Sequence, residues 1–326
     1  MRIFVFGAGA VGGHIAAKLA ASGHDVSVVA RGAHLEAMRD KGITLVHGAQ
    51  TIHGRVRTSD PGLQDFVFVT LKANSLGAFA DAAPRLVGPD TGVVFAQNGV
   101  PWWYGIGLAA ERPRPPDLSR LDPGQKLKAV LRTNQIIGGV VYSANEVREP
   151  GVIVNNVPGN NMLVVGNADD SDSEKIAALR ALLGKADLYS PPASDIRQAV
   201  WAKIVQNVGI GAICTLTGMT IAEVRGNEEL KNLAARLSAE VRAIARAHGV
   251  DPEGAPSRPG GGQSSGMISH KPSLLQDYER GRPMEIEAQL VAVRAFARAA
   301  NVPTPTLETV VPLVVFKATA RGLYGD

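Results

Sequence analysis

Residues 1–34 read MRIFVFGAGAVGGHIAAKLAASGHDVSVVARGAH, and this stretch decides the fold. The apolar run Arg2–Phe6, with its β-branched and aromatic members, predicts a buried parallel strand. The alanine-rich segment 11–22 repeats apolar residues at helical spacing, and Gly23 supplies a stop signal. Segment 26–30 predicts a second strand. Together these elements predict a β-α-β unit of about 30 residues, the building block of a parallel sheet.

A glycine motif of the form G-x-G-x-x-G joins the first strand to the helix. Gly7 permits a tight turn, Gly9 lets the backbone approach a pyrophosphate, and Gly12 lets the helix pack closely on the strand. The helix N-terminus adds N–H donors for phosphate oxygens. A glycine-rich turn without a ligand is the alternative, but the β-α-β context favours dinucleotide binding. The predicted cofactor-binding residues of this loop are Gly7, Ala8, Gly9, Ala10, Val11 and Gly12.

Arg31 follows the second strand, where NAD-binding units usually carry an acid that accepts from the ribose 2′-hydroxyl. Asp25 lies at the opposite end of that strand. A guanidinium can bind a 2′-phosphate through paired donors, whereas a carboxylate would repel it. A solvated surface arginine is the alternative. The position favours NADP over NAD.

Composition narrows the class of protein. The 326 residues suffice for two domains, and 45% hydrophobic with 20% charged residues is typical of a globular chain. The net charge is only +4, and the sequence has no run of Lys and Arg of the kind that a nucleic-acid binder would concentrate on one face. One cysteine, scattered histidines and no apparent leader or membrane-spanning run indicate a cytoplasmic protein without a metal site or a membrane partner.

Two further apolar runs, at 65–71 and 92–97, predict strands whose carboxyl ends carry Lys72 and Asn98. Ligands of open parallel sheets bind beyond these ends. Lys72 is a candidate for the adenosine phosphates and Asn98 for the nicotinamide or the bound acid. A solvated lysine and a turn-forming asparagine are the alternatives. The aromatic cluster at 102–104 either lines a substrate pocket or covers the core.

Runs at 135–142, 151–155 and 162–166 follow without helices between them, which predicts antiparallel strands that extend the sheet. The Ser-Pro-Pro sequence at 190–192 then marks a boundary. We therefore expect an α/β fold, with a Rossmann-type NADP-binding domain at 1–190 and an all-helical substrate and catalytic domain at 191–326.

The second half begins with a helix that Ser194 can cap. Lys203 and Asn207 lie four residues apart on one face of this apolar helix, so both need water, a partner or a ligand. Residues 254–269 predict a flexible loop. Glu285 then follows Pro283 at the start of a long helix, where the helix dipole favours an acid.

These motifs together resemble those of the ketopantoate reductase (2-dehydropantoate 2-reductase) family. The resemblance rests on GAGAVG, Lys72, Gln97-Asn98-Gly99, Lys203-x-x-x-Asn207 and the block SLLQD-x-E-x-G-R-P-x-E-I-E at 273–287. It runs in order over nearly the whole chain.

The resemblance implies NADPH-dependent reduction of a 2-keto acid, in pantothenate biosynthesis for the family substrate. It implies that Lys203 is the general acid and that Glu285 binds the substrate hydroxyl and sets the lysine's position. It also implies that Asn207 and Ser273 hold the substrate, while Asn98 lies near the nicotinamide. An ammonium beside the carbonyl would stabilise the alkoxide and supply its proton.

Gly211 stands where family members commonly carry a second asparagine, and the stretch 102–128 is longer than usual. Both departures bear on the identity of the substrate. Gly211 and the aromatic cluster at 102–104 favour, as an alternative, an NADP-linked dehydrogenase of a bulkier or aromatic 2-hydroxy acid. A non-catalytic NADP sensor is a further alternative, although a sensor needs no proton donor. The apolar helices of the second half are compatible with a homodimer.

Overall fold

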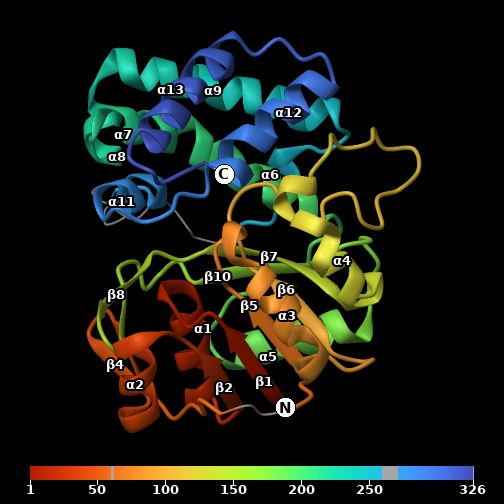
Figure 1. The fold of residues 1–326 in the computed structure, drawn as a ribbon, viewed down its shortest axis with the longest axis vertical. Coiled ribbons are helices and arrows are strands. Elements are labelled where there is room, and N and C mark those ends of the chain that lie inside the picture. The colour runs from red at the N-terminus through yellow and green to blue at the C-terminus, as the bar shows by residue number, and fades with distance from the viewer. Residues whose placement is uncertain (60–61, 259–270, 326) are drawn as a thin grey trace. The chain divides into compact units, whose positions relative to one another are not determined.

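The computed structural model describes residues 1–59, 62–258 and 271–325, and the chain forms two compact units (Figure 1). The first comprises Met1–Gln97 and Gly124–Ile196 with residues 256–258. The second comprises Asn98–Pro123 and Arg197–Ala255 with residues 271–325. The expected domain boundary after residue 190 places Asn98–Pro123 in the first domain, whereas this segment belongs to the second unit. The division into two domains at that boundary stays a prediction. Of the expected loop at 254–269, residues 259–269 lie outside the described chain.

A six-stranded sheet forms the centre of the first unit, as the β-α-β pattern predicts. Its strands lie in the order β10-β7-β6-β5-β1-β2. All neighbours pair in parallel except β10, which runs antiparallel to β7. The strands are β1 (Arg2–Phe6), β2 (Asp25–Val29), β5 (Phe66–Val69), β6 (Gly92–Phe95), β7 (Ile136–Tyr142) and β10 (Met162–Asn167).

A second, four-stranded sheet has the order β4-β3-β9-β8. Its pairs are antiparallel except β3 with β9. The antiparallel extension expected from three strands is confirmed for β7 and β10, which pair antiparallel in the six-stranded sheet, although β7 also pairs in parallel with β6. It is wrong for β9, which belongs to the smaller sheet. The strands are β3 (Ile43–His47), β4 (Gln50–Gly54), β8 (Asn145–Glu149) and β9 (Val152–Asn155).

Helix α1 (Ala10–Ala21) packs against strands of both sheets (Figure 1). Its two adjacent glycines explain the fit. A side chain on Gly12 would collide with Thr70 and the Gly7 carbonyl, and a Cβ on Gly13 would come within 2.7 Å of Ile153. Both helix faces are thus in close contact with a strand or a strand end. The unit's other helices are α2 (Gly32–Lys41), α3 (Gly77–Leu86), α4 (Lys126–Val130) and α5 (Glu174–Lys185).

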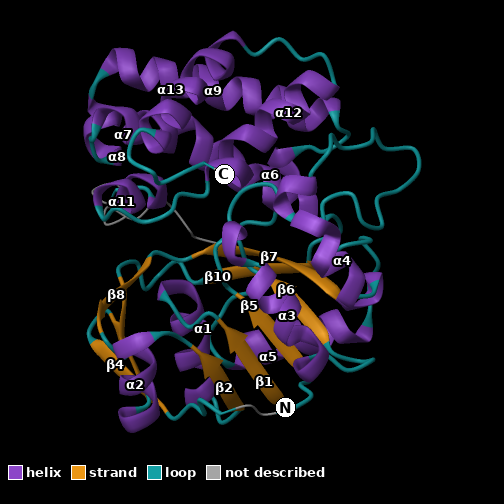
Figure 2. Cartoon of the chain, in the orientation of Figure 1, coloured by secondary structure: helices purple, strands orange, loops and turns teal. Residues whose placement is uncertain are grey.

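The described part of the second unit consists of helices and loops (Figure 2). Two single π-helical turns interrupt what the sequence predicts as continuous helices: Asn207–Gly211 after α6, and Glu287–Val291 before α12. The helices are α6 (Ile196–Gln206), α7 (Ala212–Thr217), α8 (Ile221–Gly226), α9 (Glu228–Ala247), α11 (Ser273–Glu279), α12 (Ala292–Ala299) and α13 (Pro305–Thr319).

The aromatic cluster at 102–104 belongs to the core of the second unit. Trp103 and Tyr104 are fully buried, and Tyr104 meets Trp201 and Phe296 edge to face. The buried Arg197 guanidinium donates to the Tyr104 carbonyl at 2.8 Å. These contacts attach the segment Asn98–Pro123 to the helices and settle its role as packing rather than a pocket wall.

Two local expectations are wrong. The helix that Ser194 was expected to cap begins at Ile196, whose N–H donates to the distant Asp170 carboxylate at 3.3 Å. Counted together, α6, the π-helical turn and α7 form a helical stretch, Ile196–Thr217, with the length and composition of a membrane span, contrary to the expectation that no run would reach that length. Its most apolar window is 67% buried inside the protein, as in the core helix of a soluble protein.

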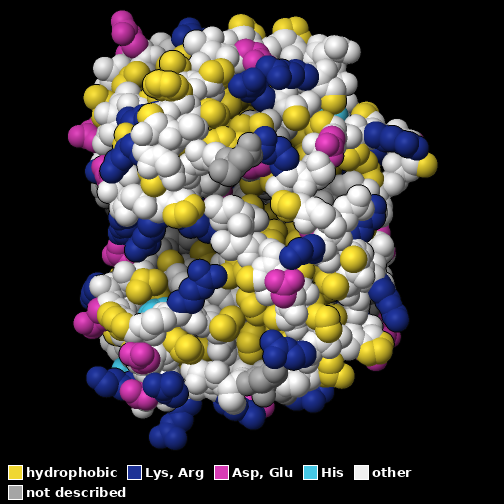
Figure 3. All heavy atoms as spheres, viewed as in Figure 1, with side chains coloured by type: hydrophobic (Ala, Val, Ile, Leu, Met, Phe, Trp, Pro, Cys, Tyr) yellow, Lys and Arg dark blue, Asp and Glu magenta, His cyan; other side chains and the backbone are white. Residues whose placement is uncertain are grey.

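Lys and Arg side chains are spread over the face seen in Figure 3, among acidic and apolar ones. The described side chains in that view form no single basic patch.

Candidate functional site

The glycine loop of the first unit is held by the ends of two strands. The Gly7 and Ala8 N–H groups both donate to the Val29 carbonyl, at 3.2 and 2.9 Å. The Thr70 hydroxyl donates to the Gly7 carbonyl at 2.7 Å. Gly7 has φ +106°, a conformation that favours glycine. The predicted tight turn is therefore present and fixed.

The loop suits an anionic ligand at the start of α1. Gly9, the N-cap residue, is exposed, and a Cβ built on it would meet no atom of the described residues within 4 Å. The cap lacks a side-chain hydrogen bond, and the first helical turn contains no acid. Backbone N–H groups and the positive end of the helix dipole thus face open space. These features fit the pyrophosphate of a dinucleotide.

Arg31 and Asp25 lie at opposite ends of β2, as the sequence indicates. Asp25 forms an ion pair with Arg57 at the start of the strand. Arg31 is the N-cap residue of α2, and its side chain is exposed. Within residues 1–59, 62–258 and 271–325 that side chain has no hydrogen-bond or ion-pair partner. It is available for an added anion such as a 2′-phosphate.

Lys72 lies three residues beyond β5, as the N-cap of a short 3₁₀ turn, and is half-buried. The neighbouring Gln97 lies at the end of β6 and donates to the Val69 carbonyl at 2.7 Å. The strand that Gln97 contacts is β5, and Lys72 follows its carboxyl end. Lys72 therefore lies on the side of the sheet where ligands of such folds bind.

Lys203 lies in the last turn of α6 in the second unit. Burial lowers the pKa of its ammonium from 10.5 to about 8. A lysine with this pKa is protonated at neutral pH and still gives up its proton readily. Asn207, on the same face, begins the π-helical turn that follows, and such turns are frequent at functional sites.

Glu285 is buried, and Gln289 holds it. The Gln289 side-chain amide donates to the Glu285 Oε2 at 3.4 Å, and the Gln289 N–H donates to the Glu285 carbonyl at 3.1 Å. Gln289 itself is 2% exposed. Gln289 is a residue that the sequence motifs do not predict. Its i+4 spacing from a buried acid was the available signal.

Asn98 begins a segment that is attached to the π-helical turn Glu287–Val291, in which Gln289 lies. The Val100 N–H donates to the Ala288 carbonyl at 2.8 Å, and Gly99, at φ +85°, leaves no room for a side chain beside Ala288. The two π-helical turns also pack against each other. The structure thus gathers the segments that carry Asn98, Asn207 and Glu285 around Glu287–Val291.

Ser273 is the first residue of α11, which packs on α7 and on the turn Asn207–Gly211. The preceding Pro272 lies beside Gly211, and among the described residues a Cβ on Gly211 would meet only the Pro272 Cβ, at 3.7 Å. Ser273 therefore follows directly on a residue that contacts the turn carrying Asn207. The position of Gly211 has room for a side chain.

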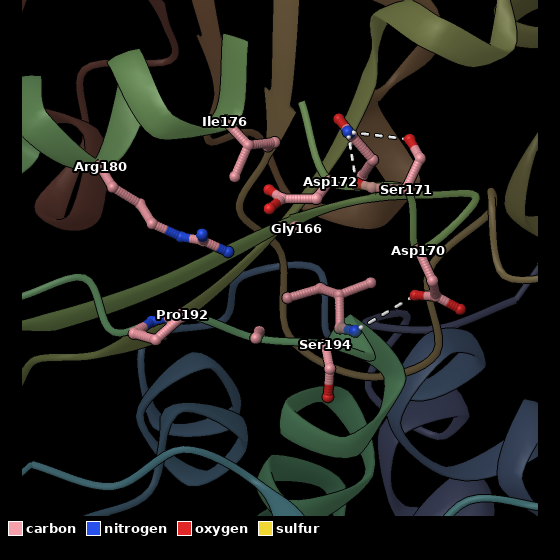
Figure 4. A pocket seen from close by; sticks show the side chains of 11 residues that line it. Gly166, Asp170, Ser171, Asp172, Ile176, Arg180, Pro192 and Ser194 are labelled. Atoms are coloured by element: carbon pink, nitrogen blue, oxygen red, sulfur yellow. Dashed lines mark hydrogen bonds between the residues drawn. The ribbon is translucent and has the colours of Figure 1, made fainter. Parts of the chain in front are cut away.

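A separate cavity of about 330 Å³ lies in the first unit, at the end of β10 and the start of α5 (Figure 4). Arg180 and Asp172 point into it, and Asp170 and Ser194 lie near its edge (Figure 4). None of the predicted site residues is among the described residues that line this cavity. Within the described chain, no group of three or more His, Cys, Asp and Glu side chains is arranged to hold a metal ion.

Comparison with known proteins identifies the family. Residues 3–114 match the model of ketopantoate reductase PanE/ApbA, and residues 195–318 match its C-terminal model. A 2-dehydropantoate 2-reductase of Mesorhizobium japonicum is 41% identical, over 99% of this chain and all of that protein. The chain belongs to the ketopantoate reductase family.

Solved structures agree with this assignment. A chain from Ralstonia solanacearum with the provisional name ketopantoate reductase is 32% identical, with a TM-score of 0.84 and 99% coverage of both chains. A D-mandelate dehydrogenase solved with NADH and anilino(oxo)acetate shares the fold at 18% identity, with a TM-score of 0.80 and 99% of this chain and 100% of that chain covered. The predicted fold class and family, an oxidoreductase that uses a nicotinamide cofactor on CH–OH groups, are confirmed.

Proposed function

We propose that this ketopantoate reductase family member uses NADPH to reduce 2-dehydropantoate, or a close 2-keto acid analogue, to the 2-hydroxy acid. The proposal rests on the buried position of Lys203, because burial lowers the pKa of its ammonium to about 8. The family supplies the reaction type, and this lysine supplies a proton donor suited to it.

The residues divide the work between the two units. In the first, the backbone of Gly7–Gly12 would bind the pyrophosphate and Arg31 the 2′-phosphate, with Lys72 near the adenosine phosphates. The bound dinucleotide supplies a hydride. In the second, the Lys203 ammonium stabilises negative charge on the C2 oxygen and transfers its proton there, which leaves a neutral amine and a hydroxyl group.

The remaining polar side chains would bind the substrate. The Glu285 carboxylate accepts a hydrogen bond from the substrate hydroxyl and sets the position of Lys203. Asn207, Ser273 and Asn98 supply the neutral donors and acceptors that hold the acid in place.

A panel of 2-keto acids tests the proposal, with nicotinamide absorbance followed in the presence of NADPH or NADH. We expect turnover with NADPH and 2-dehydropantoate. Absence of turnover with every branched 2-keto acid would refute the reductase assignment and favour a non-catalytic NADP sensor.

A dehydrogenase of bulkier 2-hydroxy acids is the second candidate, and the open space beside Gly211 favours it. The aromatic cluster at 102–104 does not, because it is packed in the core. Faster turnover of phenyl-substituted keto acids than of 2-dehydropantoate would select this candidate.

We also infer a cytoplasmic homodimer. Its support is the exposed apolar face of α13, where Phe316 is 74% and Leu313 is 53% exposed. Light scattering of the purified protein measures the mass, and a monomer at micromolar concentration would refute the dimer.

A further inference from the structure

One histidine of the first unit joins the glycine loop to two other elements. His34 lies in the first turn of α2, three residues after Arg31, and is half-buried. Its Nε2 lies 2.8 Å from the Ala8 carbonyl oxygen. The Gly151 N–H donates to its Nδ1 at 2.9 Å.

These two contacts fix the tautomer of His34. Because Nδ1 accepts from the Gly151 N–H, the ring proton lies on Nε2 and is donated to the Ala8 carbonyl. Both nitrogens of the neutral imidazole are thereby satisfied. The ring acts as a rigid spacer of fixed length between two backbone groups.

Each end of the spacer is itself held. Ala8 precedes Gly9, the N-cap of α1, and is fully buried. Gly151 has φ +79°, its carbonyl oxygen accepts from the Thr44 N–H at 2.9 Å, and a Cβ on Gly151 would come within 3.1 Å of Ala37 of α2. The first turn of α2 is therefore fixed against the glycine loop on one side and against β3 on the other.

We propose that His34 is a positioning residue for cofactor choice: it holds Arg31 at a set place relative to the glycine loop, so that NADPH is bound in preference to NADH. Arg31 caps the same helical turn, and its side chain has no partner of its own among the described residues. Its backbone is therefore positioned through α2, and His34 is the side chain that ties this turn to the loop. This inference rests on the proposed use of NADPH.

Binding titrations that follow nicotinamide fluorescence test the inference without catalysis. For His34→Ala we expect the Kd for NADPH to rise about tenfold and the Kd for NADH about threefold or less, the range expected for a lost hydrogen bond. In an Arg31→Ala background, His34→Ala should no longer change the ratio of the two Kd values. Equal losses for both cofactors, or a ratio that still changes without Arg31, would overturn the inference.

Two conservative variants separate positioning from general stability. Glutamine can reach the Ala8 carbonyl with its Nε2 donor, whereas asparagine can only replace Nδ1 as acceptor for Gly151. We expect His34→Gln to regain most of the cofactor preference and His34→Asn to regain little. Equal recovery by both would contradict the loop contact. If the unmodified protein binds neither cofactor, the proposed function itself fails, which is a distinct result.

Discussion

Gln289 and Glu285 form a buried pair four residues apart, about one helical turn, and the Gln289 side-chain amide donates to the Glu285 Oε2 at 3.4 Å. Glu285 lies just before the π-helical turn Glu287–Val291 and Gln289 lies within it, and the Asn98 segment is attached to the same turn. Glu285, which the sequence predicts as a site residue, is thus oriented by Gln289, which the sequence does not predict.

Gln289→Leu should lower kcat/KM for the keto acid about tenfold, because a hydrogen bond to a charged group contributes about 1.5–3 kcal/mol and this one is long. Steady-state kinetics with saturating NADPH measure the effect. Gln135→Leu is the matched control: Gln135 is also buried and donates to the Gly88 carbonyl at 2.7 Å, in the first unit. We expect the control to lower thermal stability and leave kcat/KM unchanged. An equal loss in both variants would mean that Gln289 is merely structural.

Lys203 should set the alkaline limb of the pH profile. Its pKa is lowered to about 8 by burial, and a general acid works only in its protonated form. The kcat/KM for keto acid reduction should therefore be level below pH 8 and fall above it. Lys203→Ala should lower turnover about a hundredfold or more while NADPH binding survives. Near-normal turnover in this variant would assign the proton donor elsewhere.

The sequence predicts the β-α-β unit at the start of the first unit well because its signals are local. Strand, glycine turn, helix and strand follow one another in about 30 residues, so Gly7, Gly12 and Arg31 can be placed by spacing alone. The open space over Gly9 and the ion pair of Asp25 with Arg57 agree with that placement.

Pairing between distant segments is what the sequence could not supply. The strands β7, β9 and β10 are close in sequence, which suggests a meander, yet β9 pairs with β3 across about a hundred residues. The Ser194 cap is wrong for the same reason, since the acceptor is Asp170 on a separate turn. His34 and Gln289 were missed because their roles depend on partners that the periodic pattern does not reveal.

Arg31→Ala should raise the Kd for NADPH by about tenfold to a hundredfold and leave that for NADH nearly unchanged, because only the 2′-phosphate offers it paired acceptors. Arg39→Ala is the control on the same helix, since Arg39 is exposed and pairs with Asp40 at 3.5 Å. Fluorescence titration measures both. Equal losses for the two cofactors would show that Arg31 does not contact the phosphate.

Gly211→Asn tests what the open position does for the substrate. A side chain there has space up to the Pro272 Cβ, and an amide adds a donor for a substrate hydroxyl. We expect the ratio of kcat/KM for 2-dehydropantoate over its analogue without the hydroxymethyl group to rise about tenfold. Phenyl-substituted keto acids should react more slowly. Gly211→Ala fills part of the space without the amide, so a similar gain there would contradict the hydrogen-bond explanation.

His14 should make the protein sensitive to acid. It is buried in α1, and burial, aided by the charge of Lys18, lowers its pKa from 6.5 to about 3. Between these values the unfolded chain binds a proton that the folded chain does not, so stability is complete above pH 6.5 and falls as the pH drops toward 3.

The size of this effect can be measured by urea unfolding. Between pH 7.5 and pH 5, protonation of His14 in the unfolded chain should lower the free energy of unfolding by about 2 kcal/mol. His14→Leu removes the titrating group together with its buried Nε2, which has no hydrogen-bond partner among the described residues, so this part of the loss should disappear. His53→Gln, at an exposed histidine of β4, should keep the full pH dependence. If His14→Leu loses as much stability at pH 5 as the unmodified protein, other groups such as His47, whose pKa burial also lowers, carry the acid sensitivity instead.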